Sequence, residues 1–289
     1  MIDVFQELPL ALFTTFAPIG AGAFSVFALL VNLFSTSKDA RKSYVYALCA
    51  PLVLVFVGFA ASVFHLANPV HMPYVVLGIG TSPLSNEIAV GGVFLVLAIV
   101  FCVLAARGVL NETQFCIFAR VVGVAALVFS IFIGFAYMIP TVHSWSTPFN
   151  SVQMLGYSLV GGVCLVPLMR SIAVRSSRGA LTQEHISSRR LCIAAGLGVA
   201  AILVGLLGQV WLTASYQNAL QSGIDLANHA VPFLLACIVL TCVALVLSYR
   251  TRVHHCAFFT ILPCAVVVLS VFAGRLAFYA MHISVGIFL

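Results

Sequence analysis

The stretch Ile88–Ala106, IAVGGVFLVLAIVFCVLAA, is 19 residues long and contains no charged side chain. The hydrocarbon core of a bilayer is about 30 Å thick, and an α-helix of roughly 20 apolar residues crosses it. The whole 289-residue chain has the same character, with 63% hydrophobic and 7% charged residues and a mean hydropathy of +1.18. Soluble proteins carry about 25% charged residues. We therefore expect an all-α integral membrane protein with almost nothing outside the bilayer.

Apolar runs of about this length occur eight times along the chain. The sequence therefore predicts eight transmembrane helices, arranged as two packed four-helix bundles in a single transmembrane domain over residues 1–289. The long connection Ser171–Arg190 marks possible halves, 1–170 and 171–289. The predicted spans are Leu8–Phe34, Tyr44–Leu66, Ile88–Ala106, Phe115–Met138, Val152–Met169, Leu191–Ala214, Ala230–Tyr249 and Ala257–Ile283.

Lys and Arg residues alternate from one connection to the next. The connections after the first, third, fifth and seventh spans carry basic side chains, and those after the second, fourth and sixth carry none. The positive-inside rule then predicts basic connections in the cytoplasm and both termini outside. The first 37 residues contain no Lys or Arg, so the first run lacks the basic flank of a signal peptide and is expected to remain as a span. The basic residues of these connections are Lys38, Arg41, Lys42, Arg107, Arg175, Arg178, Arg189, Arg190, Arg250 and Arg252.

The net charge of +6, from 13 basic and 7 acidic residues, reflects this topology signal. The basic residues lie in short connections and form no stripe with interleaved aromatic residues, which a nucleic-acid interface would require. We therefore expect the protein to contact membrane lipid and not nucleic acid.

Cysteine and histidine spacing predicts neither a cluster nor a haem in this protein. The nine cysteines include no C-x-x-C pair, and the closest two are Cys237 and Cys242, so we expect no iron–sulfur cluster and no metal site. A transmembrane haem would need axial histidines at matched depth within the helices. The spans offer only His65 and His282, both near the outer surface, so we expect no haem.

Ionisable residues gather at the outer ends of three spans. His65 ends the second span and Glu87 opens the third, so both face the same leaflet. Arg275 is the one basic residue in the outer half of the membrane, which makes it a candidate for function. Arg275, Tyr279 and His282 follow the spacing i, i+4, i+7 and therefore lie on one helical face.

Two interpretations of these five residues remain open. An imidazole, a carboxylate, a guanidinium and a phenol at one depth form a protonatable pocket, which quinol oxidation requires. In that pocket His65 would accept the first proton from a quinol hydroxyl and Glu87 would relay protons outwards. In the other interpretation the same residues are ordinary interfacial side chains, with Arg extending to the headgroups and Glu favoured at a helix start.

Two outer connections, Asn68–Asn86 and Ile139–Ser151, are rich in proline and contain Tyr74 and Trp145. This composition is expected to exclude regular helix. The connections could form an interfacial cap or a docking surface for a partner, or they could be ordinary solvated loops.

At these residues the protein resembles a known family, the membrane-anchor subunits of the dimethyl sulfoxide reductase type (DmsC-like). The segments Leu84–Ala89 and Gly274–Gly286 are the most specific matches, and together with the other segments they cover nearly the whole sequence in the right order. The other matching segments are Glu7–Leu10, His65–Pro69 and Trp145–Pro148.

The resemblance implies an eight-helix anchor without haem in the cytoplasmic membrane of a prokaryote. Such an anchor oxidises menaquinol and passes the electrons to a four-cluster iron–sulfur subunit, which feeds a molybdopterin catalytic subunit. His65 and Glu87 match family positions associated with the quinol site. One departure is Val271, which stands where the family often has an acidic residue shortly before the Gly-Arg pair, so this protein lacks a second acid for proton handling at that position.

A secondary transporter and a purely structural anchor are the alternative functions. A transporter is expected to carry charges and broken helices near the membrane midplane. In this protein the ionisable residues avoid the midplane, and Pro18 and Pro263 do not occupy corresponding places in two inverted halves. A structural anchor without a redox site would not need His65, Glu87 and Arg275 at one level.

Overall fold

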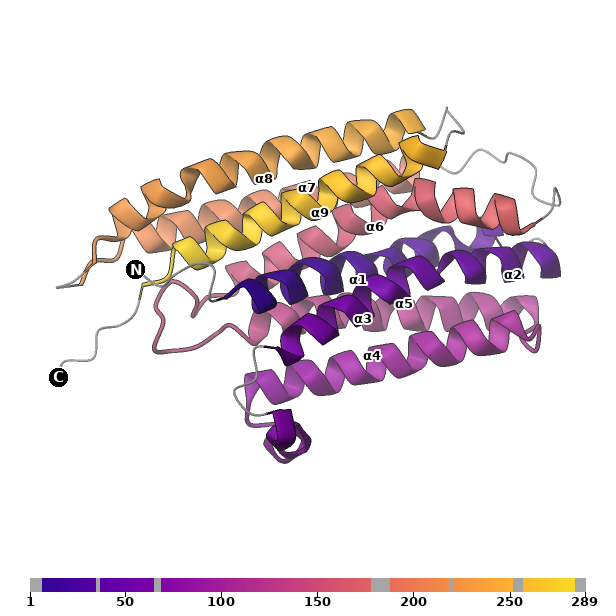
Figure 1. Cartoon of the computed structure of the whole chain (residues 1–289), viewed down its shortest axis with the longest axis horizontal. Helices are drawn as coiled ribbons and strands as arrows, with labels where there is room; N and C mark the ends of the chain where they lie inside the picture. Colours follow the sequence, from indigo (N-terminus) through magenta and orange to yellow (C-terminus); the bar gives the residue numbers. More distant parts are fainter. Residues whose placement is uncertain are drawn as a thin grey trace.

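The computed structural model describes residues 7–34, 37–64, 69–177, 188–218, 221–251 and 257–283, and their regular structure is helical (Figure 1). Eight spans in this part of the protein are long and apolar enough to cross a membrane, with α2 and α3 together forming the second one. This confirms the predicted all-α membrane fold. The helices are α1 (Leu8–Phe34), α2 (Lys38–Ala47), α3 (Cys49–Val63), α4 (Pro83–Ala106), α5 (Glu112–Phe135), α6 (Phe149–Ser176), α7 (Ser188–Ala214), α8 (Gly223–Thr251) and α9 (Ala257–Ala280), with a 3₁₀ helix, η1 (Pro69–Gly78).

Several helices extend beyond the apolar runs that predicted them. Helix α5 begins at Glu112, three residues before the predicted start, because Asn111 and Gln114 form a capping box. The Asn111 side chain accepts from the Gln114 backbone N–H at 2.8 Å, and the Gln114 side chain accepts from the Asn111 N–H at 3.1 Å. Polar first turns of this kind continue a helix past its membrane segment.

The second span is broken where a continuous helix was predicted. Helix α2 ends at Ala47 and α3 begins at Cys49. Pro51 has no backbone N–H and cannot donate to the carbonyl of Ala47, so one hydrogen bond of the helical ladder is missing there.

The expectation that the connection 68–86 contains no regular helix is wrong. Residues 69–78 form η1, and α4 already begins at Pro83 with Ser82 as its cap. Proline is tolerated in the first turn of a helix, where its missing N–H would have no intrahelical acceptor. The expectation for the connection 139–151 holds as far as residue 148: residues 139–148 form turns and bends, whereas α6 already begins at Phe149.

Helices α1 and α6 form the centre of the bundle. In their most apolar windows 83% of the α1 residues and 78% of the α6 residues are buried, against 22–50% in the other spans. The two helices meet at Gly22 and Gly162, where a Cβ atom on either residue would overlap the backbone of the other helix. This close backbone approach is typical of transmembrane helix pairs.

The remaining helices pack around this pair in two groups (Figure 1). Helices α1 to α5 supply four spans on one side, and α6 to α9 supply four on the other. Residue 170 lies inside α6, and the division into halves 1–170 and 171–289 stays a prediction.

The two ends of the bundle differ in charge. Helices α1, α4, α6 and α8 begin at one end, which we call the site end, and α3, α5, α7 and α9 finish there. The basic residues among the described residues lie toward the opposite, basic end, with the exception of Arg275. The basic end therefore carries the charge pattern expected of a cytoplasmic face, and the orientation itself stays a prediction.

Candidate functional site

Arg275 is fully buried at the site end, between three helices. Its side chain is 0% exposed although it lies five residues before the last residue of α9. Its Nε donates to the hydroxyl of Thr14 on α1 at 2.8 Å, and its Nη1 donates to Oδ1 of Asn150 on α6 at 2.8 Å. Asn150 in turn donates to the backbone carbonyl of Gly134 at 3.1 Å, so the guanidinium is tied to α1, α5 and α6 at once.

Aromatic rings enclose the same guanidinium. Its central carbon lies 4.0 Å from the ring centre of Phe278, 5.1 Å from that of Tyr137 and 5.2 Å from that of Tyr279. Trp145 stacks on Phe278 with ring centres 5.0 Å apart, and its indole N–H donates to the Phe278 carbonyl at 3.4 Å. A cation over aromatic faces is stabilised most strongly where water is excluded, as here.

Two phenols form a hydrogen-bonded pair beside Arg275. The hydroxyls of Tyr137 and Tyr279 are 2.7 Å apart, and both side chains are buried. Burial, and then the neighbouring Tyr279, raise the pKa of Tyr137 well above its ordinary range, so this phenol keeps its proton. The Tyr137 phenol can therefore take part in hydrogen bonds but does not ionise.

Glu87 completes the cluster from α4. It is the fifth residue of that helix, its side chain is 3% exposed, and its Oε1 is buried without a hydrogen-bond partner. The carboxyl group interacts electrostatically with Arg275 and with Tyr137. A buried carboxyl oxygen without a partner is costly, which marks this position for a role beyond packing.

The structure brings three of the five predicted site residues together: Glu87, Arg275 and Tyr279. His282 is separated from these three residues by the ring of Trp145. The His282 and Trp145 rings are in edge-to-face contact, with their centres 4.8 Å apart. Burial lowers the pKa of His282 from its ordinary value near 6.5, which favours the neutral imidazole. His65 lies outside the described residues, so its place in this pocket stays a prediction.

Sequence reasoning missed Thr14, Tyr137 and Asn150. Asn150 was placed before the fifth span, whereas α6 already begins at Phe149. A usable signal was present, because uncharged polar side chains at the ends of apolar spans often hydrogen-bond between helices. Their partners could not be read from the sequence, since Arg275 and Asn150 are 125 residues apart.

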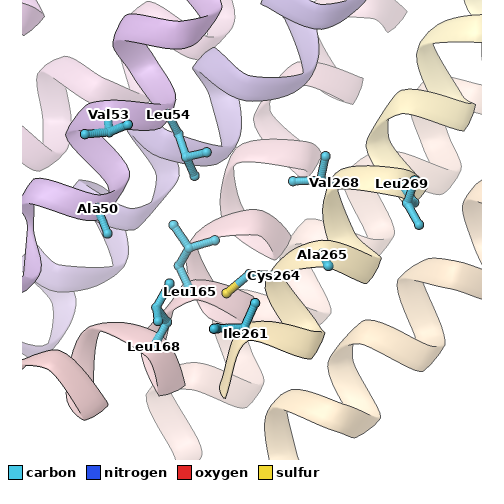
Figure 2. A pocket seen from close by; sticks show the side chains of 10 residues that line it. All are labelled: Ala50, Val53, Leu54, Leu165, Leu168, Ile261, Cys264, Ala265, Val268 and Leu269. Carbon is cyan, nitrogen blue, oxygen red and sulfur yellow. The ribbon is translucent and has the colours of Figure 1, made fainter. Parts of the chain in front are cut away.

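An apolar groove on the molecule is distinct from this cluster. It has a volume of about 620 Å³ and is lined by side chains of α3, α6 and α9, among them Leu54, Leu165 and Val268 (Figure 2). Its α9 residues lie between Ile261 and Leu269, toward the basic end, and none of the lining side chains is charged. Apart from the Cys264 thiol, the lining of the groove offers no group that could exchange a proton, so the polar cluster is the candidate site.

Comparison with known proteins agrees with this architecture. Residues 1–281 match the family described as DMSO reductase anchor subunit (DmsC). The protein is 25% identical over 285 residues to the C subunit of an anaerobic dimethyl sulfoxide reductase of Haemophilus influenzae, an alignment that spans 97% of this sequence and 96% of that one. It is 28% identical over 287 residues to the YnfH subunit of an anaerobic dimethyl sulfoxide reductase of Escherichia coli K12, with 97% and 96% covered. Because the family match extends over nearly the whole length, this protein belongs to the DmsC family of DMSO reductase anchor subunits.

Proposed function

We propose that this anchor oxidises menaquinol at the site end and passes the electrons to an iron–sulfur subunit of its complex. A molybdopterin catalytic subunit would then reduce the terminal substrate. The observation that carries the proposal is Glu87, a buried carboxyl group with one unpartnered oxygen, held beside the buried Arg275 and two paired phenols. Membrane proteins rarely bury such groups unless they serve a function.

The chemistry requires a proton acceptor at the quinol hydroxyls. Oxidation of one quinol gives one quinone, two electrons and two protons. His65, as a neutral imidazole, would accept the first proton, and Glu87 would carry protons toward the aqueous phase. The guanidinium of Arg275 interacts electrostatically with the Glu87 carboxyl group, which lies in a buried position.

The residues around Arg275 supply orientation. Two of its nitrogens are fixed by Thr14 and Asn150, while its Nη2 is buried without a partner. This nitrogen can donate a hydrogen bond to a quinone oxygen, because a buried quinone oxygen is an acceptor that is unfavourable without a donor. The phenol pair of Tyr137 and Tyr279 adds one further O–H donor for a quinone oxygen, since the hydrogen of the other hydroxyl lies between the two phenols.

The electrons would pass directly from the quinol to the nearest cluster of the iron–sulfur subunit. Because electron tunnelling is short-ranged, that subunit must dock at the site end, close to α1, α4 and the connection 139–148. A secondary transporter is less well supported, since the Asp, Glu, Lys and Arg side chains among the described residues lie toward the two ends of the spans and not at their centre.

The test compares His65→Ala and Glu87→Gln in the assembled complex. Loss of a general acid or base costs about 10²–10⁴-fold in rate, so both variants should lose quinol-dependent reduction to that extent. Activity with a soluble dye as electron donor should persist, because the dye bypasses the anchor.

Glu112→Gln is the matched control, since Glu112 also lies near the start of a transmembrane helix but at the basic end. This variant should keep quinol oxidation. Loss of a general acid or base would reduce the rate far more than roughly threefold. If the quinol-dependent activities of His65→Ala and Glu87→Gln both stay within roughly a factor of three of the parent protein, the protein is an anchor without a redox site.

A further inference from the structure

A second set of buried polar side chains lies at the site end, between α6 and α7. Gln153 on α6 is 0% exposed, and Gln209 and Thr213 on α7 are 1% and 0% exposed. The nitrogen and oxygen of both glutamine amides and the hydroxyl of Thr213 are buried without hydrogen-bond partners. None of these residues belongs to the cluster around Arg275.

Helix packing directs these side chains toward one another. Gly205, Gln209 and Thr213 follow an i, i+4, i+8 spacing on α7, which places them on one face. That face lies against α6 at Gln153, because a Cβ atom on Gly205 would stand 2.7 Å from the Cβ of Gln153. Side chains lean toward the amino terminus of their helix, so on these oppositely directed helices Gln153 leans toward the site end and Gln209 leans away from it. The two amides therefore converge.

One end of this polar stripe meets the candidate site. Asn150 lies three residues before Gln153 on α6, on the same side of the helix, and it accepts the hydrogen bond from Arg275. The other end of the stripe approaches the surface where α7 finishes. There Thr213 is followed by Gln221, whose Oε1 is also buried and unpartnered, and by the exposed residues Ser215 and Gln217.

A buried amide that is left without partners is unfavourable, and the low dielectric of a membrane interior makes it more so. Native proteins satisfy such groups with one another or with bound water, which typically makes about three hydrogen bonds in a polar site. Each amide provides both a donor and an acceptor, so a row of amides can hold water molecules in a connected row.

We propose that Gln153, Gln209 and Thr213 line a hydrated proton path that leads from Asn150 and Arg275 to the aqueous surface at the site end. The inference rests on the proposed quinol oxidation, because it supplies an exit for a proton released at that site. The positive charge of Arg275, where the path begins, repels a proton on this path and so favours its movement away from the candidate site toward the aqueous surface.

The test uses two substitutions of one residue in the intact complex. Gln209→Leu fills the position with an apolar side chain of similar size, whereas Gln209→Ala removes the amide but leaves room for water. A hydrated path predicts that Gln209→Leu lowers quinol-dependent turnover by about tenfold or more, as for impaired proton transfer, and that Gln209→Ala retains most of it. The ratio of turnover in H₂O to turnover in D₂O should rise for Gln209→Leu, because proton transfer then limits the rate.

Thr213→Val and Ser158→Ala form a matched pair, because each replaces a buried hydroxyl without a partner by an apolar side chain of similar size. Ser158 lies beside Gly22 of α1, away from α7. Thr213→Val should raise the solvent isotope effect, and Ser158→Ala should not. Gln209→Met is a second apolar variant for the case that Gln209→Leu does not assemble, because Met adapts to irregular packing.

The proposal is overturned if the leucine and alanine variants of Gln209 have the same turnover, since the amide then serves only helix packing. It is also overturned if the apolar variants leave the solvent isotope effect unchanged. A failure of the proposed function gives a different result, because Glu87→Gln would then retain quinol-dependent activity. If Glu87→Gln loses this activity and Gln209→Leu keeps normal turnover, the quinol site stands and only the proton path is disproved.

Discussion

At the scale of single residues, Arg275 is the side chain on which the site depends. It combines complete burial, two hydrogen bonds of 2.8 Å to different helices and three aromatic neighbours. Lysine cannot replace this arrangement, because its compact ammonium group lacks the planar fork that reaches Thr14 and Asn150 together.

We expect Arg275→Lys to destabilise the purified protein. The substitution leaves the Asn150 oxygen or the Thr14 hydroxyl without its donor, and an unsatisfied buried polar group costs about 1–3 kcal/mol. Thermal unfolding in detergent should show a clearly lower Tm. Arg190→Lys is the control, since Arg190 makes one exposed hydrogen bond, to the Leu29 carbonyl, and exposed changes stay within about 0.5 kcal/mol. Equal Tm values for the two variants would contradict the role assigned to Arg275.

The sequence predicted part of this site. Helical spacing placed Arg275 and Tyr279 on one face, and the depth of Glu87 matched theirs. Which residues would meet the guanidinium could not be predicted, because Thr14 and Asn150 are distant in the sequence and come close only through the packing of α1 and α6.

At the scale of helices, the crossing of α1 and α6 holds the two groups of spans together. Its closeness depends on Gly22 and Gly162, whose missing side chains let the backbones touch. Without a hydrophobic driving force between helices in lipid, such packing contacts supply much of the association energy.

Gly162→Ala is therefore expected to loosen the bundle. Its Cβ would overlap the backbone of Gly22 and stand 2.8 Å from the side chain of Val26, and overpacking of this kind costs about 1–3 kcal/mol. Gly92→Ala on α4 is the control, because a Cβ there has no neighbour within 4 Å and alanine favours a helix. Thermal unfolding should rank Gly162→Ala below the parent protein and Gly92→Ala at or above it; the reverse order would contradict the close crossing.

The helices themselves could be predicted, and their ends could not. Eight apolar runs became eight spans because the bilayer requires about 20 apolar residues per crossing. The ends are decided by local chemistry that hydropathy does not register, such as the capping box of Asn111 and the proline after the break in the second span. The 3₁₀ helix η1 was missed for the same reason.

At the scale of the whole molecule, polar groups are distributed by depth. Glu87, Thr14, Asn150, Arg275 and the glutamines of α6 and α7 lie within about two or three helical turns of the site end, whereas the exposed basic residues lie at the other. The molecule is thus asymmetric across the bilayer. A buried polar layer at one end suits proton exchange with the aqueous phase on that side.

This asymmetry makes orientation the decisive prediction for the whole molecule. Twelve of the thirteen basic residues belong to the connections after odd-numbered spans or to the adjoining helix ends, so the positive-inside rule places the basic end in the cytoplasm and the site end outside. A reporter that is active only outside the cytoplasm should therefore work when fused after Leu289 and fail when fused at Thr36 or near Gly179. The last two positions provide the internal control, because both belong to basic connections. The iron–sulfur and catalytic subunits should then be accessible to protease added from the outside, since the proposed quinol oxidation requires a cluster close to the site end. If the reporter works at Thr36 and Gly179 and fails at Leu289, the site end faces the cytoplasm, and protons from quinol oxidation would be released there instead.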